Sequence, residues 1–244
     1  MNKHLQTILT EMSDDSYRSG EWSEEGVYES IKTVSWAAYE KARQLSDISY
    51  LPDLYNLVIT STTADTKGHA YFIIGFIAKN AKNEPATEFL LNRLKVEKST
   101  SLIMLILDRL AELYKPAHFD LSVIYQLIEK RGSLIRHSAY MALTNTGQKV
   151  ENSLLDLLAK TSEREDMIWI IKALSYIGTE KSIAVLKGYL KHRKLHVRDE
   201  VRNKLPTIMI RAGIPITEIC RLNRVSTQFV EFHKAQIDLL TRPG

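Results

Sequence analysis

The sequence predicts an all-α protein, a right-handed α-solenoid of about five to six antiparallel helix pairs. Three observations point to this fold class. Apolar residues recur at helical spacing, an apolar pattern repeats every 31 to 33 residues, and glycine and proline are scarce. The ten Gly and six Pro are fewer than a turn-rich all-β protein needs. A repeat period of about 20 to 50 residues is typical of stacked helical units.

One apolar position recurs in five successive units, at intervals of 33, 33, 31 and 31 residues. Within one unit the spacing is helical, because Met167, Ile170, Ile171 and Leu174 fall on a single face. Each unit should therefore hold a first and a second helix. The recurring residues are Ile77, Leu110, Leu143, Leu174 and Leu205. First helices are expected at 66–80, 99–113, 133–147, 164–178 and 195–212, and second helices at 51–62, 84–96, 117–130, 149–160 and 180–193.

Proline and glycine mark the expected helix ends. Pro52, Pro85 and Pro116 are 33 and 31 residues apart and predict helix starts, where the missing N–H of proline has no cost. Gly147 and Gly178 fall where first helices should end, at the C′ position that tolerates the left-handed conformation.

A single helix pair of this length cannot bury its own apolar face, so neighbouring pairs must supply the core. A helix at 3–13 and a longer one at 24–46, with Ser23 as its N-cap and Trp22 packed on Val27, are expected before the array. The expected domains are N-terminal capping helices at 1–47, the repeat array at 48–212 and C-terminal capping helices at 213–244.

Pairs of residues two periods apart carry a family resemblance. Ile135-Arg136 and Val197-Arg198, with Ala142-Leu143 and Ala173-Leu174, resemble the Val-Arg and Ala-Leu positions of HEAT and HEAT-like repeats, and Ile177-Gly178 continues the pattern. The resemblance covers 48–212 and is closest over 133–194. Gln148 and Thr179 stand where those repeats commonly have Asp. The resemblance to HEAT repeats implies an ARM-type superhelix whose second helices line a concave face. It implies a binding protein rather than an enzyme.

The net charge of +4 conceals a gradient along the chain. Residues 1–65 hold five bases and eleven acids, whereas residues 187–224 hold ten bases and three acids. Lys187, Lys191 and Lys194 stand at i, i+4 and i+7, and Arg198 and Arg202 at i and i+4. These stripes predict a site for an acidic protein or a nucleic acid, although a solvated helix face gives the same pattern. The predicted partner-binding residues are Lys187, Lys191, Arg193, Lys194, Arg198, Arg202 and Arg211.

The C-terminal segment allows a second interpretation. Residues 216–230 resemble a helix-turn-helix, with Asn223 at the turn and Thr227, Gln228 and Glu231 facing the groove. Arg224 stands where such segments usually have Gly before Val-Ser. The alternative is that helices at 216–223 and 226–240 cap the array. A DNA-binding protein using this tail or the cationic stripes therefore remains an alternative function.

The residues do not point to catalysis. No phosphate loop, His-Glu-x-x-His, Cys-x-x-Cys or Gly-x-Ser-x-Gly motif is present, so no catalytic residue, metal or cofactor is predicted. Cys220 falls on an apolar helix face and is expected to be buried. His192 and His196 lack a neighbouring carboxylate and are expected in a solvated basic loop.

An enzyme alternative comes from HEAT-like glycosylases that remove alkylated bases with tryptophans and an acid. Trp36, Trp169 and Asp108 are the residues to consider, but Trp169 adjoins the apolar face and is expected in the core. We therefore predict a binding protein and not an enzyme.

Composition excludes disorder, because 44% of residues are apolar and 25% are charged. The longest apolar run, 71–78, is too short to cross a membrane, and the first residues lack a secretory pattern. With a single cysteine, a cytoplasmic protein is expected. The sequence leaves the oligomeric state open.

Overall fold

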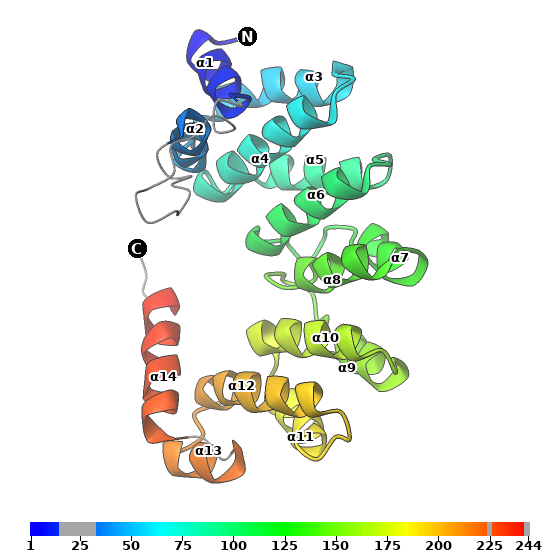
Figure 1. The fold of residues 1–244 in the computed structure, drawn as a ribbon, viewed down its shortest axis with the longest axis vertical. Helices are drawn as coiled ribbons and strands as arrows, with labels where there is room; N and C mark the ends of the chain where they lie inside the picture. Colours follow the sequence, from blue (N-terminus) through cyan, green and yellow to red (C-terminus); the bar gives the residue numbers. More distant parts are fainter. Residues whose placement is uncertain (15–32, 224–225, 242–244) are drawn as a thin grey trace, which may run out of the picture. The chain divides into compact units, whose positions relative to one another are not determined.

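The computed structural model describes residues 1–14, 33–223 and 226–241 (Figure 1). This part of the chain contains fourteen α-helices and one short 3-10 helix, with no β-strand, so the all-α prediction is confirmed. The helices are α1 Lys3–Met12, α2 Val34–Arg43, η3 Ile48–Tyr50, α3 Leu51–Thr60, α4 Ala64–Asn80, α5 Glu84–Leu94, α6 Thr100–Glu112, α7 Ser122–Lys130, α8 Ser133–Ala142, α9 Glu151–Lys160, α10 Arg164–Ile177, α11 Glu180–Tyr189, α12 Leu195–Arg211, α13 Ile216–Asn223 and α14 Thr227–Thr241.

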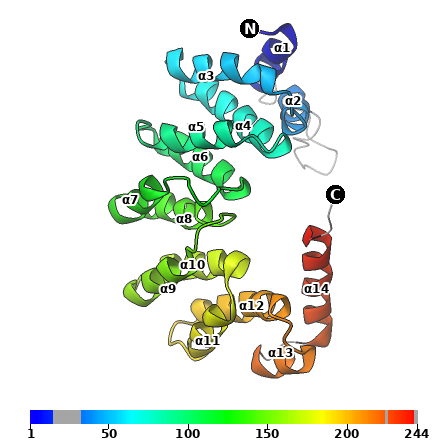
Figure 2. The ribbon, with the colours of Figure 1, turned by 180° about the vertical axis from the view of Figure 1, so that it is seen from behind.

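The helices form two compact units, Met1–Ile124 (unit 1) and Tyr125–Gly244 (unit 2), which divide within α7. In unit 1, α4 packs against α3, α5 and α6, and α1 packs against α2. In unit 2, α9 pairs with α10 and α11 with α12, while α8, α10 and α12 lie side by side (Figures 1 and 2). Helices α13 and α14 pack on each other and on α12.

The repeat alignment is reproduced in the core. All five recurring apolar residues have no exposed surface, two of them in unit 1 and three in unit 2. On α10, Met167, Ile170, Ile171 and Leu174 are buried together, as their spacing predicts. The first helices therefore bury equivalent faces against their neighbours.

Two predicted helices are shorter than expected. Helix α7 begins at Ser122, and Pro116 lies in the preceding loop, so this proline does not start a helix. The carboxylate of Asp120 accepts a hydrogen bond from the Ser122 N–H at 2.9 Å and starts the helix there instead. Helix α8 ends at Ala142, five residues early, and Asn145 after it adopts a left-handed φ of 53°.

Gly178 follows the last residue of α10, as its predicted place at a helix end requires, but its backbone is not left-handed. Gly178 has a φ of −62°, and Gly213 is the one described glycine with positive φ, so neither Gly147 nor Gly178 is left-handed. Gly178 is instead required by close packing. A Cβ on this residue would lie 2.6 Å from the Leu174 carbonyl oxygen and 2.8 Å from the Ser182 hydroxyl.

The predicted start of the opening helix, with Trp22, Ser23 and Val27, lies outside the described residues. Its later part is α2, which Thr33 caps by accepting a hydrogen bond from the Trp36 N–H at 3.1 Å.

A buried lysine closes the end of α6. Lys115 has no exposed surface, and its Nζ donates to the carbonyl oxygens of Leu110 at 2.5 Å and Leu113 at 2.7 Å. Burial lowers the pKa of the Lys115 amine to about 7. The amine therefore satisfies the Leu113 carbonyl and is a second donor to the Leu110 carbonyl, which also accepts from the Leu113 N–H at the helix end.

Helices α4 and α6 approach each other at Gly75. The Arg109 side chain crosses α4 at this point, so a Cβ on Gly75 would lie 2.6 to 2.9 Å from three of its carbon atoms. The guanidinium of Arg109 lies over the rings of Phe72 and Phe76, at 5.4 Å and 4.9 Å from their centroids. Glycine is thus a packing requirement here.

We expect Gly75→Ala to lower the free energy of unfolding by about 1–3 kcal/mol, because the new methyl overlaps Arg109. Urea denaturation measures the change. The control is Gly188→Ala on α11, where a Cβ meets nothing within 4 Å and alanine should raise stability by up to ~1 kcal/mol. Equal stabilisation of both variants would contradict the packing requirement.

Glu151 links two successive second helices of unit 2. Its carboxylate accepts hydrogen bonds from the Thr179 N–H at 2.8 Å, the Ser182 N–H at 3.1 Å and both hydroxyls. Thr179 and Ser182 lie at the N-terminus of α11, one repeat after Glu151 on α9. Burial alone raises the pKa of Glu151, but these hydrogen bonds outweigh it and lower the pKa below its usual value.

Glu151→Gln should reduce the free energy of unfolding at pH 7 by about 1–3 kcal/mol. Because the folded-state pKa is depressed, the carboxylate stabilises the fold above its unfolded pKa of about 4.3, and this contribution is lost as pH falls through the folded value. Urea denaturation at several pH values should show the deficit shrinking toward acid. Asp156→Asn, an exposed change on α9, is the control and should have no comparable effect.

Candidate interaction surface

The seven predicted partner-binding cations differ in what they contact. Arg211, at the end of α12, donates to the carbonyl oxygens of Ser175 at 2.6 Å and Gly178 at 3.0 Å, which close the end of α10. Burial lowers the pKa of this guanidinium, and Glu151 opposes the shift. Arg211 therefore acts as a link between first helices.

Arg198 has a similar internal role. It donates to the carbonyl oxygens of His192 at 2.8 Å and Arg193 at 3.3 Å, in the loop after α11. Arg136, two periods earlier, donates to the Arg131 carbonyl at 3.1 Å in the loop after α7. The arginine of the Val-Arg pattern thus holds the loop that precedes its own helix.

Two further cations are also engaged. Lys194 donates through Nζ to the Ser162 carbonyl oxygen, which joins the α11–α12 loop to the α9–α10 loop. Arg202 pairs with Asp199 at 3.3 Å on the same helix. Lys187, Lys191 and Arg193 have no hydrogen-bonding or ion-pairing side-chain partner among the described residues, and the last two are exposed. These three remain available to a partner.

Three loops of unit 2 that join second to first helices lie at the same end of the helices. Arg136 contacts both the Arg131 carbonyl in the α7–α8 loop and Asp166 in the first turn of α10. Lys194 connects the α11–α12 loop to the α9–α10 loop. Each loop, or the helix end before it, carries exposed cations. We call this set the basic edge; it comprises Lys130, Arg131, Lys160, Lys191 and Arg193.

Lys130, Arg131 and Lys160 are not among the partner-binding residues predicted from the sequence. The available signal was the repeat itself, since Lys130, Lys160 and Lys191 are 30 and 31 residues apart. A lysine at a helix C-terminus also interacts favourably with the helix dipole, and this interaction stabilises the helix without any ligand. Exposed Glu129 and Glu163 lie beside these cations and reduce the local charge.

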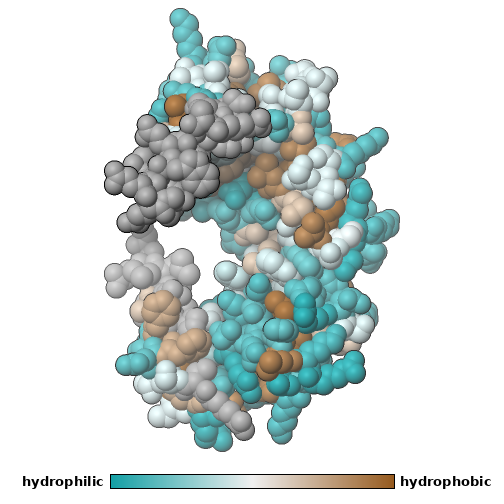
Figure 3. All heavy atoms as spheres, viewed as in Figure 1, coloured by the Kyte–Doolittle hydropathy of each residue, from teal (hydrophilic) through white to brown (hydrophobic). Residues whose placement is uncertain are grey.

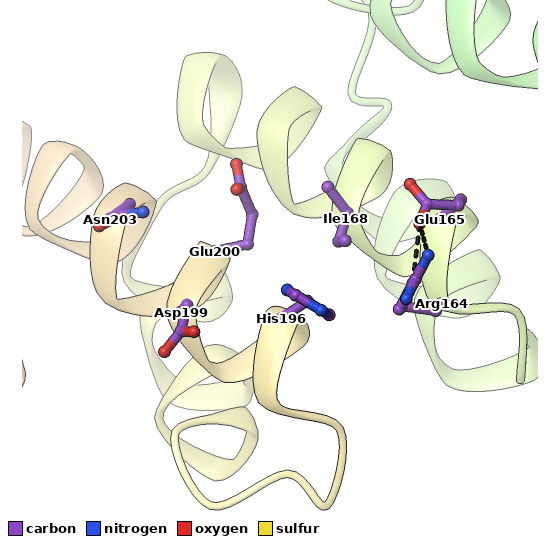
Figure 4. A pocket seen from close by; sticks show the side chains of 7 residues that line it. All are labelled: Arg164, Glu165, Ile168, His196, Asp199, Glu200 and Asn203. Atoms are coloured by element: carbon purple, nitrogen blue, oxygen red, sulfur yellow. Dashed lines mark hydrogen bonds and ion pairs between the residues drawn. The ribbon is translucent and has the colours of Figure 1, made fainter.

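A hollow between α10 and α12 adjoins the basic edge. Its outer part, about 510 Å³, is lined by Glu163, Arg164, Glu165, Lys194, Leu195 and His196. Its inner part, about 390 Å³, reaches Ile168, Asp199, Glu200 and Asn203 (Figure 4). Figure 4 shows His196 between Glu200 and the Arg164–Glu165 ion pair, whose Nη2–Oε1 distance is 2.6 Å. The acidic side chains make this hollow unsuited to a polyanion.

The drawn face of unit 2 around α10 and α12 is mostly hydrophilic (Figure 3). Leu195, at the start of α12, is an apolar residue with 53% of its surface exposed. A partner on this part of unit 2 is therefore expected to bind through charge more than through an apolar patch.

A buried acid connects α8 and α10. The Asp166 carboxylate pairs with Arg136 at 3.1 Å and lies 3.3 Å from His137 Nε2, without the geometry of a hydrogen bond to the histidine. Burial lowers the pKa of His137 despite Asp166, so the imidazole is neutral at pH 7. Burial, with a smaller effect of Asp166, raises the pKa of Tyr140 to about 12. The cluster is a packed polar link between the two helices.

Trp169 is not a core residue, which corrects the expectation. It is half-buried, its ring stacks on His137 with centroids 5.5 Å apart, and Lys172 Nζ lies 4.0 Å from its centroid. Polar and charged neighbours thus already contact the ring on which a flipped base would have to stack. Trp36, with 39% exposure, and exposed Asp108 belong to unit 1.

Cys220 is half-exposed and not buried as expected; its Sγ lies 3.9 Å from the Thr227 hydroxyl. His192 stacks on Tyr189 and accepts a hydrogen bond from the Lys194 N–H at 3.2 Å. Across the part of the chain that the structure describes, no three acidic, histidine or cysteine side chains come together as metal ligands.

The two C-terminal helices pack on α12. Ile219, Asn223 and Val230 have no exposed surface, and α14 contacts α12 as well as α13. Asn223 is the last residue of α13, and its side-chain amide donates to the Ile219 carbonyl at 2.9 Å. Thr227, Gln228 and Glu231 are exposed. Arg224 lies outside the described residues.

Comparison of the chain with protein-family models and with curated proteins finds no match. None of the described helices is both long and apolar enough to span a bilayer. Function is therefore inferred from the charge and geometry of the chain itself.

Removing the linking cations should cost stability, whereas removing the free ones should not. Arg198→Ala and Arg211→Ala are each expected to lower the free energy of unfolding by about 1–3 kcal/mol, because carbonyls at the end of α10 and in the loop after α11 lose their charged donors. Lys187→Ala and Lys191→Ala should change it by less than about 0.5 kcal/mol. Chemical denaturation of the four variants distinguishes the two groups, and equal losses in all four would refute the distinction.

Proposed function

We propose that the protein is a non-enzymatic binding module, a HEAT-like α-solenoid that holds an acidic partner along the basic edge of unit 2. The observation that carries the proposal is the recurrence of exposed cations at the same end of three successive helix pairs. An array repeated from unit to unit suits an extended ligand.

The spacing of the array fits an extended acidic segment. Packed helices lie about 8–10 Å apart, so successive units present cations at about that interval. A polyproline II segment advances about 3.1 Å per residue with three residues per turn, so every third side chain lies on one face and reaches the next unit. An acid at every third position could therefore meet Lys130 or Arg131, then Lys160, then Lys191 or Arg193. Such exposed pairs weaken as salt screens them.

The direction of curvature in this proposal differs from the expectation. Along each unit, the closest packing between successive pairs involves the first helices, α4 with α6 and α8 with α10 and α12. Second helices of neighbouring pairs, such as α9 and α11, contact each other far less. Closer packing on one side favours curvature toward that side, so we assign the concave side of each unit to its first helices and not to its second helices.

Nucleic acid is the second candidate partner, because phosphates could use the same edge. Four of the seven predicted cations, Lys194, Arg198, Arg202 and Arg211, already contact other groups of unit 2. The acidic hollow beside the edge also disfavours a bulky polyanion. We therefore favour an acidic protein segment. No contact of the described residues supports glycosylase chemistry.

The test measures binding of fluorescent polyglutamate and of a short DNA duplex by anisotropy, at low and near-physiological salt. The edge variant combines Lys160→Glu, Lys191→Glu and Arg193→Glu. The control combines Lys3→Glu, Lys98→Glu and Lys149→Glu, which are exposed residues outside the edge and give the same change in net charge. We expect the edge variant to bind polyglutamate at least about tenfold more weakly, with less than about a twofold effect in the control.

Equal weakening in both variants would mean that net charge, and not the edge, attracts the ligand. DNA bound more tightly than polyglutamate, and released by the edge variant alone, would replace the protein partner with nucleic acid. No binding of either probe would refute the proposed function.

A further inference from the structure

Unit 1 contains a separate hollow of about 290 Å³ among α2, α4 and α6. Its aromatic side is formed by Tyr39 from α2 and by His69 and Phe72 from α4. Its apolar side is formed by Leu102 from α6, which is buried. Asp65 lies at its exposed margin. The volume suits one side chain or a small molecule, since sites for larger ligands are commonly about 300–1,000 Å³.

The rings meet at right angles. Tyr39 and Phe72 have centroids 4.9 Å apart and an interplanar angle of 90°, and Tyr39 and His69 are 5.9 Å apart at 80°. The Ser13 hydroxyl lies 3.2 Å from His69 Nδ1 and fixes this ring. Perpendicular rings form a corner whose π faces attract cations.

The charge of the hollow is negative. Asp65 lines the hollow together with both rings and makes no ion pair with a described residue, and its charge acts to raise the pKa values of Tyr39 and His69. Burial is the larger effect on both groups, and it lowers the pKa of His69, so that the imidazole is neutral at pH 7. The carboxylate therefore has no compensating cation among the residues that line the hollow.

Two arginines lie near the same rings without neutralising Asp65. Arg43 and Arg109 lie over Phe72, 5.9 Å and 5.4 Å from its centroid. Each is paired with a glutamate on its own helix, Arg43 with Glu40 and Arg109 with Glu112. Their contacts show that rings of this group already attract cations within the fold.

Gly68 keeps the hollow open. Glycine inside a helix is unfavourable relative to alanine, so its presence within α4 needs a reason. Close packing is not the reason, because a Cβ would lie 3.7 Å and 3.8 Å from Leu102 and Leu105, which is ordinary contact. Gly75 on the same helix differs, since a Cβ there would overlap Arg109. A larger side chain at position 68 would project into the hollow.

We propose that this hollow binds an organic ammonium group on a short apolar stem, with Asp65 pairing with the nitrogen and Tyr39 providing a ring face. The ammonium could belong to a free amine or to a lysine side chain of a partner, because both present the same chemistry. The inference does not depend on the basic edge, which has the opposite charge and lies in unit 2.

The experiment titrates the full chain with n-butylammonium, with 1-butanol as a neutral isostere, and with a short unstructured peptide containing one lysine. Chemical shifts of the Tyr39 and His69 rings report occupancy, and calorimetry gives the affinity. We expect saturable binding of the ammonium in about the millimolar range, with the alcohol at least about fivefold weaker. Tighter binding of the peptide identifies a partner lysine, and tighter binding of butylammonium identifies a free amine.

Two variants test the geometry. Asp65→Asn should abolish the preference for the ammonium over the alcohol, and Gly68→Leu should abolish binding of both by filling the hollow. The matched controls are Asp156→Asn and Gly188→Leu, both at exposed positions of unit 2, and they should bind as the parent does. Circular dichroism and the unfolding midpoint establish that each variant is folded.

Three results would overturn the inference: no binding of the ammonium, equal binding of ammonium and alcohol, or unchanged binding in folded Gly68→Leu. If Gly68→Leu fails to fold, Asp65→Asn alone decides, because it leaves the volume of the hollow unchanged.

Discussion

Each helix pair leaves an apolar face that only its neighbour can cover, and the burial of these faces holds each unit together. Ile77 and Leu110 in unit 1, and Leu143, Leu174 and Leu205 in unit 2, occupy equivalent positions and have no exposed surface. Burying one such side chain contributes about 1.5–3 kcal/mol relative to leaving it exposed. The close approach at Gly75 serves the same purpose, since it lets α4 and α6 pack with Arg109 between them.

Packing the faces creates a second requirement, because polar groups at the helix ends must find partners nearby. Side chains of neighbouring elements supply them: Glu151 caps α11, Arg211 closes the end of α10, and Asn80 donates to the Arg43 and Leu45 carbonyls after α2. Lys115 does the same within its own loop. Many charges therefore stabilise the fold, and a count of cations in the sequence overestimates those that a partner can reach.

Sequence reasoning located most helices within a few residues, because their apolar spacing is strong. It failed where a local hydrogen bond or a close contact decided the outcome, as at Asp120 before α7 and at Gly178. It also treated the basic residues as one block along the chain. Lys130 and Lys160 were missed for that reason, although the repeat period brings them to the same end of the helices as Lys191. Trp169 was assigned to the core because periodicity cannot reveal its contacts with His137 and Lys172.

The sequence by itself determined the helical class, the repeat and the apolar face of each first helix, since these depend on the order of residues along one helix. The tertiary structure decided which charges are used internally. Arg211 meets Ser175 across 36 residues and Lys194 meets Ser162 across 32, and such distances along the chain close only when the helices pack. It also decided the different roles of two glycines in α4. Gly75 packs against Arg109, whereas Gly68 borders the hollow beside Asp65. Contacts between neighbouring pairs, which no local pattern encodes, make that difference.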